Sequence, residues 1–298
     1  MKNYDIYLYG MILKTNSFLL DGDYPKPDTY GEIKEKYCLP GGETGTCATV
    51  LSNLGCSVKM DGNHMGVNTY PLIKQFYNDK SVDYSPLYYD KDYDGLEDYV
   101  FIDKNTRTPF GTFAHYYSDG TKRWNTPKKE DISAAAVVGL DPYFEEATLE
   151  VAQLCQKLKK PYVTIDCAFD SKLHQLSSIN IVSNEFIKPH YDGQPREELF
   201  KKYTANTDGL VIFTLGAKDV MYGRKGEEPH FFKTYKIDVV STLGAGDTFK
   251  AGCVYALLKG MNDEQTVSFA SACAAVACTR FPLPLNPPCL EEIEKLQK

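Results

Sequence analysis

Val239-Val-Ser-Thr-Leu-Gly-Ala-Gly-Asp-Thr-Phe-Lys-Ala-Gly252 joins a glycine-rich turn to a carboxylate at the start of a helix. Before the turn, residues 231–240 carry alternating and β-branched side chains, which predict a strand. After it, apolar side chains between Phe249 and Leu258 recur at helical spacing, and Gly260 predicts the end of the helix. Residues 244–247 are therefore expected to turn the chain from strand to helix.

This turn has the chemistry of a phosphate site. Gly244 and Gly246 let an anion approach the main chain, and the first amides of the helix are unpaired and lie at the positive end of its dipole. Asp247 would be repelled by a phosphate, so we expect it to take a proton from an attacking hydroxyl. The alternative is an ordinary glycine turn in which Asp247 is only the helix N-cap.

The string from Val239 to Phe249 resembles the C-terminal signature of the ribokinase-like (PfkB) carbohydrate kinases, and residues 242–249 match the ketohexokinases of that family most closely. The resemblance implies that Asp247 is the base and that the amides of Gly244, Ala245 and Gly246 form the anion hole. Ser241 departs from the signature, which has an aspartate there. Ribokinases use that aspartate to help hold potassium, so the resemblance implies a monovalent cation that Ser241 places in doubt.

Composition argues against several other classes of protein. The 298 residues carry a formal net charge of −7 and the basic residues do not cluster, so nucleic acid is not an expected partner. No stretch is apolar and long enough to span a membrane or to serve as a signal peptide, which predicts a cytoplasmic location. The nine cysteines include no Cys-x-x-Cys pair and are expected to be reduced core residues.

A second glycine pair, Gly41-Gly42, precedes an amphipathic helix expected near residues 44–54. The pair either brings the backbone close to a ligand or only provides a sharp bend. Residues 41–55 resemble the N-terminal signature of the family, which implies that the glycines contact the acceptor. Two further acceptor contacts, an aspartate and an asparagine in the family, are Thr15 and Thr46 here. We therefore expect altered specificity, with plain fructose or ribose as poor acceptors.

The resemblance also implies a nucleotide site at the ends of two later strands. Thr214 and Gly216 resemble residues that lie along the nucleotide, and Asn184 matches an asparagine that arranges water and magnesium around the phosphates. The family's glutamate three residues later is Ile187 here, which leaves Glu185 as the candidate for holding magnesium through water. An Asx turn is the alternative for Asn184.

Arg123 resembles an arginine that the family brings to the nucleotide phosphates. The preceding turn carries one residue more than usual, so Lys122 is a competing assignment. An exposed charge on a hairpin is the alternative for either residue.

Strands and helices alternate between residues 134 and 214, which predicts a mainly parallel sheet with helices on both faces. Residues 99–124 instead predict antiparallel hairpins, with strands at 99–102 and 111–117 and turns at 103–106 and 118–121. The resemblance implies an α/β fold, a ribokinase-like three-layer sandwich with a small β-sheet lid.

By the same resemblance, residues 1–298 form one domain whose discontinuous lid comes from about 11–40 and 95–125. The expected activity is transfer of phosphate from ATP, with Mg²⁺, to a small sugar, and the lid offers a surface for a homodimer. A nucleoside kinase, or a protein that binds sugar or nucleotide without catalysis, remains the alternative.

Overall fold

A nine-stranded sheet forms the centre of the molecule in the computed structural model, which describes residues 3–298 except 105 and 119. From one edge to the other its strands are β13 (His230–Phe232), β12 (Val220–Gly223), β11 (Leu210–Thr214), β10 (Ile179–Ser183), β9 (Tyr162–Ile165), β8 (Ala135–Leu140), β1 (Tyr4–Gly10), β4 (Val58–Gly62) and β5 (Val82–Asp83). The strands from β11 to β5 run parallel, and β12 and β13 are antiparallel. The mainly parallel sheet expected from the sequence is confirmed.

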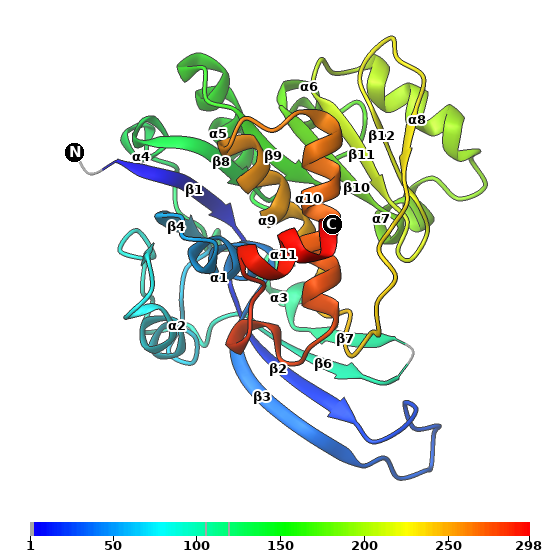
Figure 1. Ribbon diagram of the computed structural model, residues 1–298. Helices are drawn as coiled ribbons and strands as arrows, with labels where there is room; N and C mark the ends of the chain where they lie inside the picture. The colour runs from blue at the N-terminus through cyan, green and yellow to red at the C-terminus, as the bar shows by residue number, and fades with distance from the viewer. Residues whose placement is uncertain (1–2, 105, 119) are drawn as a thin grey trace.

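Helices cover both faces of this sheet because the side chains of its strands are apolar on both sides. In β1, Ile6 and Leu8 enter one core, whereas Tyr7 and Tyr9 enter the other. The first face is covered by α1 (Glu43–Asn53), α2 (Tyr70–Tyr77), α9 (Ala245–Leu258), α10 (Asp263–Cys278) and α11 (Leu290–Gln297). The second is covered by α4 (Lys129–Ala134), α5 (Glu145–Leu158), α6 (Lys172–Leu176), α7 (Asn184–His190) and α8 (Arg196–Ala205) (Figure 1).

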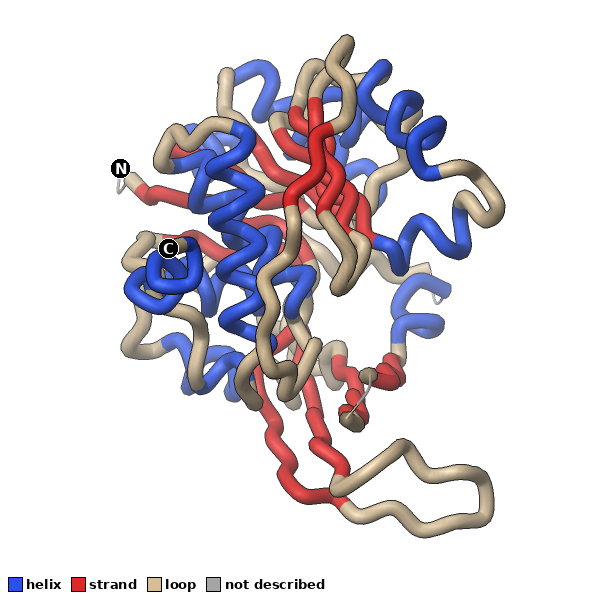
Figure 2. The backbone as a smooth tube through the Cα atoms, turned by 45° about the vertical axis from the view of Figure 1, so that its right-hand side comes forward, coloured by secondary structure: helices blue, strands red, loops and turns tan. Residues whose placement is uncertain are grey.

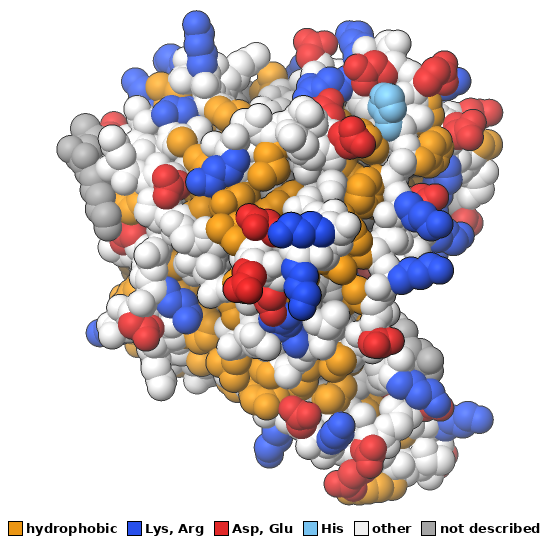
Figure 3. Space-filling model, viewed as in Figure 1, with side chains coloured by type: hydrophobic (Ala, Val, Ile, Leu, Met, Phe, Trp, Pro, Cys, Tyr) orange, Lys and Arg blue, Asp and Glu red, His pale blue; other side chains and the backbone are white. Residues whose placement is uncertain are grey.

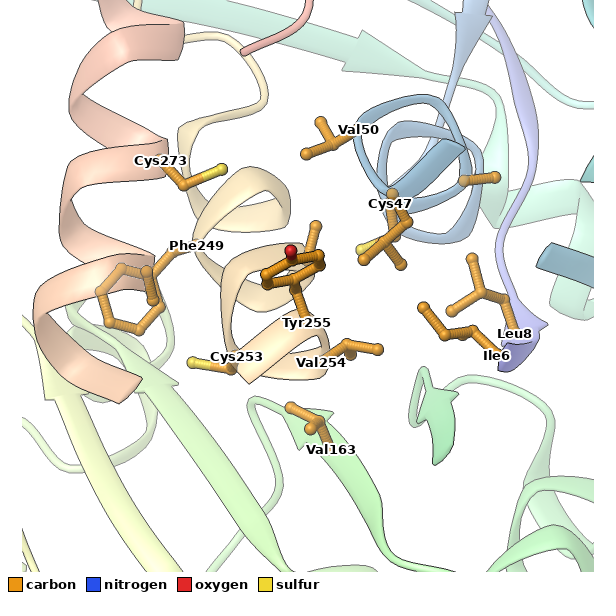
Figure 4. Close-up of a cluster of buried hydrophobic side chains, with 14 of the residues drawn as sticks. Ile6, Leu8, Cys47, Val50, Val163, Phe249, Cys253, Val254, Tyr255 and Cys273 are labelled. Carbon is orange, nitrogen blue, oxygen red and sulfur yellow. The ribbon is translucent and has the colours of Figure 1, made fainter. Parts of the chain in front are cut away.

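The first core contains several of the cysteines. Cys47 of α1, Cys253 of α9 and Cys273 of α10 lie among the apolar side chains that Figure 4 draws around α9. All nine cysteines are unpaired and six are buried. The expectation that they are reduced and mainly structural is therefore confirmed.

A second, four-stranded sheet projects from one end of the central sheet (Figures 1 and 2). Its order is β3 (Ile33–Gly41), β2 (Leu13–Leu20), β6 (Glu97–Ile102) and β7 (Arg107–Gly111). The pairs β2–β3 and β6–β7 are antiparallel hairpins, but the central pair β2–β6 is parallel. The loop between β2 and β3 forms the tip farthest from the central sheet (Figure 2).

Two predicted strands are wrong. Residues 111–117 were expected to be a strand, but Phe113–Ser118 forms a helix, α3, in which Tyr116 is buried and packs against Trp124. The expected turn at 118–121 includes residue 119 and so lies partly outside the described residues.

The other wrong strand covers residues 231–240, of which only the first part belongs to β13. The chain then runs without a strand partner to Val240, whose N–H donates to the carbonyl of Cys278 at the end of α10. This bond, 2.8 Å long, delivers the glycine-rich turn from a helix end and not from a sheet.

Because β1 and β8 to β11 are parallel, their carboxyl ends meet at one edge of the central sheet, where ligands of such sheets bind. The second sheet lies beside this edge, since β2 follows β1 after two residues. No helix in the described part of the chain is long and apolar enough to cross a membrane.

Candidate active site

The turn before α9 leaves main-chain donors free. Gly244 has φ 78° and is the N-cap, so α9 begins at Ala245 and Asp247 is its third residue. The interpretation of Asp247 as the N-cap is therefore wrong. The N–H groups of Gly244, Gly246 and Asp247 meet no backbone acceptor among the described residues, whereas that of Ala245 donates to the carbonyl of Thr242 at 3.2 Å.

Gly246 also faces open space. A Cβ atom placed there would have no atom within 4 Å, although one at Gly244 would lie 2.8 Å from Leu283. Two of the three amides predicted for the anion hole are thus unpaired, and the third, of Ala245, is shared with Thr242. The amide of Asp247 is a further unpaired donor that the sequence reasoning did not include.

The carboxyl group of Asp247 is partly buried beside this turn. Burial and the neighbouring charge of Asp141 raise its pKa to about 6, while Lys250 and Arg107 oppose the rise. At neutral pH the group is mostly ionised. It can therefore accept a proton, and its pKa is closer to neutral than that of an ordinary aspartate.

A buried ion pair lies behind Asp247. Lys250 of α9 and Asp141, just after β8, are both fully buried, and Lys250 Nζ donates to Asp141 Oδ1. The other oxygen, Oδ2, accepts from the N–H of Met11 and the hydroxyl of Thr44, both at 2.8 Å. The pair joins α9 to β1 and α1, and so fixes the helix that carries Asp247. The sequence reasoning missed it, although a lysine inside an otherwise apolar helix was a visible signal.

The second glycine pair is required by packing within the chain. A Cβ at Gly41 would lie 1.9 Å from Thr15 Oγ1. Gly42 has φ 78°, and a Cβ there would lie 2.5 Å from the carbonyl oxygen of Met11. The bend between β3 and α1 accounts for both glycines, whether or not a ligand approaches them.

A cavity of about 380 Å³ opens between the two sheets. Six of the residues predicted from the sequence line it, namely Thr15, Gly41, Gly42, Thr46, Gly244 and Asp247. Much of the remaining wall is apolar or aromatic: Met11, Leu13, Leu39, Pro40, Phe113, Tyr117, Tyr143, Leu243, Phe281, Pro282, Leu283 and Pro284. The structure thus brings the predicted acceptor residues to the predicted base.

Glu43 is a second carboxyl group of this wall that the sequence reasoning missed. Burial, followed by the charges of Asp141 and Asp247, raises its pKa far above the usual range. The hydroxyl of Tyr143 donates to Glu43 Oε1 at 2.8 Å. Glu43 is therefore expected to be mainly protonated when Asp247 is ionised.

The predicted nucleotide residues fall at the ends of two adjacent strands. Asn184 and Glu185 follow β10, and Thr214 and Gly216 lie at the end of β11, where Ser183 pairs with Thr214. Asn184 Oδ1 accepts from Arg196 at 2.7 Å, and the Ser183 hydroxyl, which accepts from the N–H of Phe186, caps the helix that Asn184 begins. No cluster of three or more metal-binding side chains occurs among the described residues.

Ile187, where the family has its glutamate, is buried in the core under α7 and α8. Glu185 is exposed and pairs with Arg107 at 2.7 Å. It would have to leave this ion pair, or share it, to help hold magnesium.

Arg123 does not join these residues. Its guanidinium lies over the ring of Tyr93, 4.9 Å from the centroid, and its neighbour Trp124 pairs with Asn63 beyond β4, four strands from β10. Lys122, the competing assignment, forms exposed ion pairs with Glu145 and Glu146. The hairpin between β6 and β7 directs a different arginine to the turn.

That residue is Arg107, the first residue of β7. It donates to Thr242 Oγ1 at 3.3 Å and to Glu185 at 2.7 Å, and its charge reaches Asp247. Arg107 therefore links the end of β10 to the turn before α9. A basic residue after the Asp103 to Thr106 turn was its only sequence signal.

Sequence comparison agrees with this arrangement over most of the chain. The profile of the pfkB family of carbohydrate kinases matches residues 15–283. The chain belongs to the PfkB carbohydrate kinase family. The finer likeness to ketohexokinases stays a prediction.

Curated relatives of this PfkB family member are similar over shorter segments. The chain is 39% identical over 70 residues to ribokinase from Haemophilus influenzae and 33% identical over 105 residues to 1-phosphofructokinase from Vibrio cholerae. These segments cover 24% and 35% of the chain, and 22% and 31% of the two relatives. The matched segments thus span less than a third of the length of either relative.

Solved structures are similar over nearly the whole chain. A putative ribokinase from Agrobacterium tumefaciens has a TM-score of 0.87 at 20% identity, covering 99% of this chain and 97% of that one. A ribokinase from Arabidopsis thaliana, complexed with ribose and ATP, has a TM-score of 0.80 at 18% identity, covering 100% and 99%. The expected ribokinase-like α/β fold is confirmed.

Proposed function

We propose that this protein transfers the γ-phosphoryl group of ATP to a hydroxyl of a small sugar. The observation that supports this best is the position of Asp247. Its carboxyl group lines the cavity that contains Thr15 and Thr46, and it also lies beside the unpaired amides of Gly244 and Gly246. An acceptor hydroxyl in the cavity and a phosphoryl group at the turn would therefore meet at one carboxylate.

In this proposal the acceptor hydroxyl gives its proton to Asp247 as it attacks the phosphorus in line. The amides of Gly244 and Gly246, with the amino end of α9, stabilise the negative charge of the transferring group. Arg107 adds a positive charge on the nucleotide side. The buried pair of Lys250 and Asp141 holds the helix in place while the proton moves.

The described residues offer a fitting place for the nucleotide. We place its phosphates at the open side of Gly246, and its remaining part along Asn184, Thr214 and Gly216 at the ends of β10 and β11. Magnesium bound with ATP would neutralise part of the phosphate charge, with Glu185 as a water-mediated contact. Arg123 has no role in this proposal.

We propose further that residues 1–298 form one domain, in which the second sheet acts as a lid that excludes water from the cavity. The outer face of this sheet suits a homodimer. Phe18 and Phe101 stack there with centroids 4.9 Å apart, and Phe110 at its edge is 49% exposed. The cytoplasmic location and the absence of a nucleic-acid partner stay predictions.

Ser241 bears on the monovalent cation. Its hydroxyl accepts from the N–H of Leu243 at 3.2 Å, so the position offers a neutral oxygen in place of a carboxylate. We propose that potassium changes the rate little.

The test is a screen for ADP release with ATP and Mg²⁺ across pentoses, hexoses, ketoses, amino sugars and nucleosides, with product detection by mass spectrometry. We expect at least one sugar to be phosphorylated, and the activity to disappear when magnesium is chelated. The Asp247→Asn protein is the matched control for contaminating kinases. If no acceptor raises ADP release above the ATP-only rate while sugars or nucleotides still bind, the protein is a binding protein on this fold.

A further inference from the structure

The wall of the cavity carries acidic side chains without basic ones. Its lining, within the described part of the chain, includes the carboxyl groups of Glu43, Asp98 and Asp247 but no lysine, arginine or histidine. The nearest buried base, Lys250, is neutralised by Asp141. Nothing in the wall therefore offers an ion-pair partner to an acceptor that bears a phosphate or a carboxylate.

Asp98 is the carboxyl group of this wall that belongs to neither helix. It lies on β6 directly opposite Thr15 of β2, in the parallel pair at the centre of the second sheet (Figure 1). Side chains alternate along both strands, so Glu97 and Lys14 form their 2.9 Å ion pair on the opposite face. The polar face toward the cavity is thus made by Thr15 and Asp98 together.

The carboxyl group of Asp98 is incompletely satisfied. Its Oδ1 atom is buried and has no hydrogen-bond partner among the described residues. The hydroxyl of Thr15 hydrogen-bonds to the group, but burial still raises its pKa to about 6. A buried oxygen without a donor costs free energy, and a donor brought by a ligand would remove that cost.

Resting on the proposed function, we propose that Asp98 binds the acceptor by accepting a hydrogen bond from it, and that the acceptor carries no anionic group. The carboxylate that position 15 lacks is thereby supplied from the neighbouring strand. Thr15 is a positioning residue, because its hydroxyl is engaged with Asp98. The apolar part of the wall, which includes Phe113 and Leu243, suits an acceptor with fewer hydroxyls than a plain hexose or with an apolar substituent.

The test measures binding separately from phosphoryl transfer. Affinities of the wild-type protein, Asp98→Asn and Glu97→Gln are determined by calorimetry for matched sets of uncharged, amino, phosphorylated and carboxylated monosaccharides. Asp98→Asn keeps the shape but loses the charge. Glu97→Gln removes a charge from the same strand on the face away from the cavity, and serves as the control.

We expect the wild-type protein to bind uncharged or amino sugars more tightly than their phosphorylated or carboxylated counterparts. Asp98→Asn should weaken binding of the best sugar roughly ten- to a hundredfold, as the loss of a hydrogen bond to a charged group does, with nucleotide affinity unchanged. Glu97→Gln should bind sugar like the wild type. The acceptor KM should follow these affinities.

Three results would overturn the inference: tighter binding of anionic sugars, an unchanged affinity in Asp98→Asn, or no binding of any uncharged or amino sugar. If sugars bind as expected but no phosphate is transferred, the proposed function fails and the assignment of Asp98 stands. If transfer occurs and Asp98→Asn has the wild-type KM, the reverse holds.

Discussion

The entrances to α1 and α9 look alike in sequence but serve different purposes. Each helix follows a glycine with φ 78°, Gly42 before α1 and Gly244 before α9, and each carries an acidic residue in its first turn. The glycines before α1 are required because a side chain there would collide with Thr15 or with the main chain of Met11. Gly246, in contrast, borders open space.

The two carboxyl groups differ in the same way. Glu43 receives a hydrogen bond from Tyr143, and its raised pKa keeps it mainly protonated. Asp247 has Lys250 and Arg107 nearby, which hold its pKa lower, at about 6. The comparison teaches that one entrance completes the packing between the sheets, whereas the other is kept open for chemistry.

Replacing Asp247 should break the second entrance with the largest effect. Asp247→Asn keeps the size of the side chain but cannot take the proton, so turnover should fall by about two to four orders of magnitude. ATP affinity should persist or tighten slightly, because a negative charge near the phosphates is removed. Turnover and nucleotide affinity measured on one preparation check this, and near-normal turnover would remove Asp247 as the base.

Alanine at one glycine of each entrance tests the comparison directly. Gly41→Ala should destabilise the protein by about 1–3 kcal/mol, because the new methyl group collides with Thr15. Gly246→Ala lies in open space within a helix, so its stability should be unchanged or higher by about 0.5–1 kcal/mol. Its turnover should nevertheless fall, because the methyl group occupies the approach to the free amides. Denaturant unfolding and turnover are the measurements, and equal stability losses would contradict the distinction.

The pH dependence should follow the entrance to α9. The reactive form of Asp247 is the carboxylate, so kcat should fall roughly tenfold per pH unit as the pH drops below about 6. An aspartate with an ordinary pKa would keep its activity about two units further. The Asp98→Asn protein should keep this acidic limb in kcat, because Asp98 titrates in the same range but affects binding. A limb that disappears in Asp98→Asn would assign it to the wrong carboxyl group.

Neutralising Glu43 should have the smallest effect. Glu43→Gln resembles the protonated side chain that the raised pKa predicts, so turnover at pH 7 should stay within about threefold of the wild type. A loss as large as that of Asp247→Asn would show that Glu43 works as a carboxylate.

The sequence by itself determined the parts of this protein that depend on neighbouring residues. The turn at residues 244–247, the start of α9 and the alternation of strands and helices are local patterns, and the two family signatures consist of such patterns. Apolar helical positions likewise predicted the buried cysteines. The local patterns failed where contacts overrode them: Tyr116 packs as part of a helix, and the strand ending in Val240 finds no partner beyond β13.

Only the tertiary structure decided which distant side chains share the site. Lys250 meets Asp141 across 109 positions of the chain, and Arg107 meets Thr242 across 135. Asp98 faces Thr15 because β2 and β6 pair in parallel with one particular register. A shift of one residue would turn Asp98 to the outer face, and the alternation of a single strand does not say which partner lies opposite. The base was therefore predictable from its own turn, whereas the arginine beside it and the carboxylate across the cavity were not.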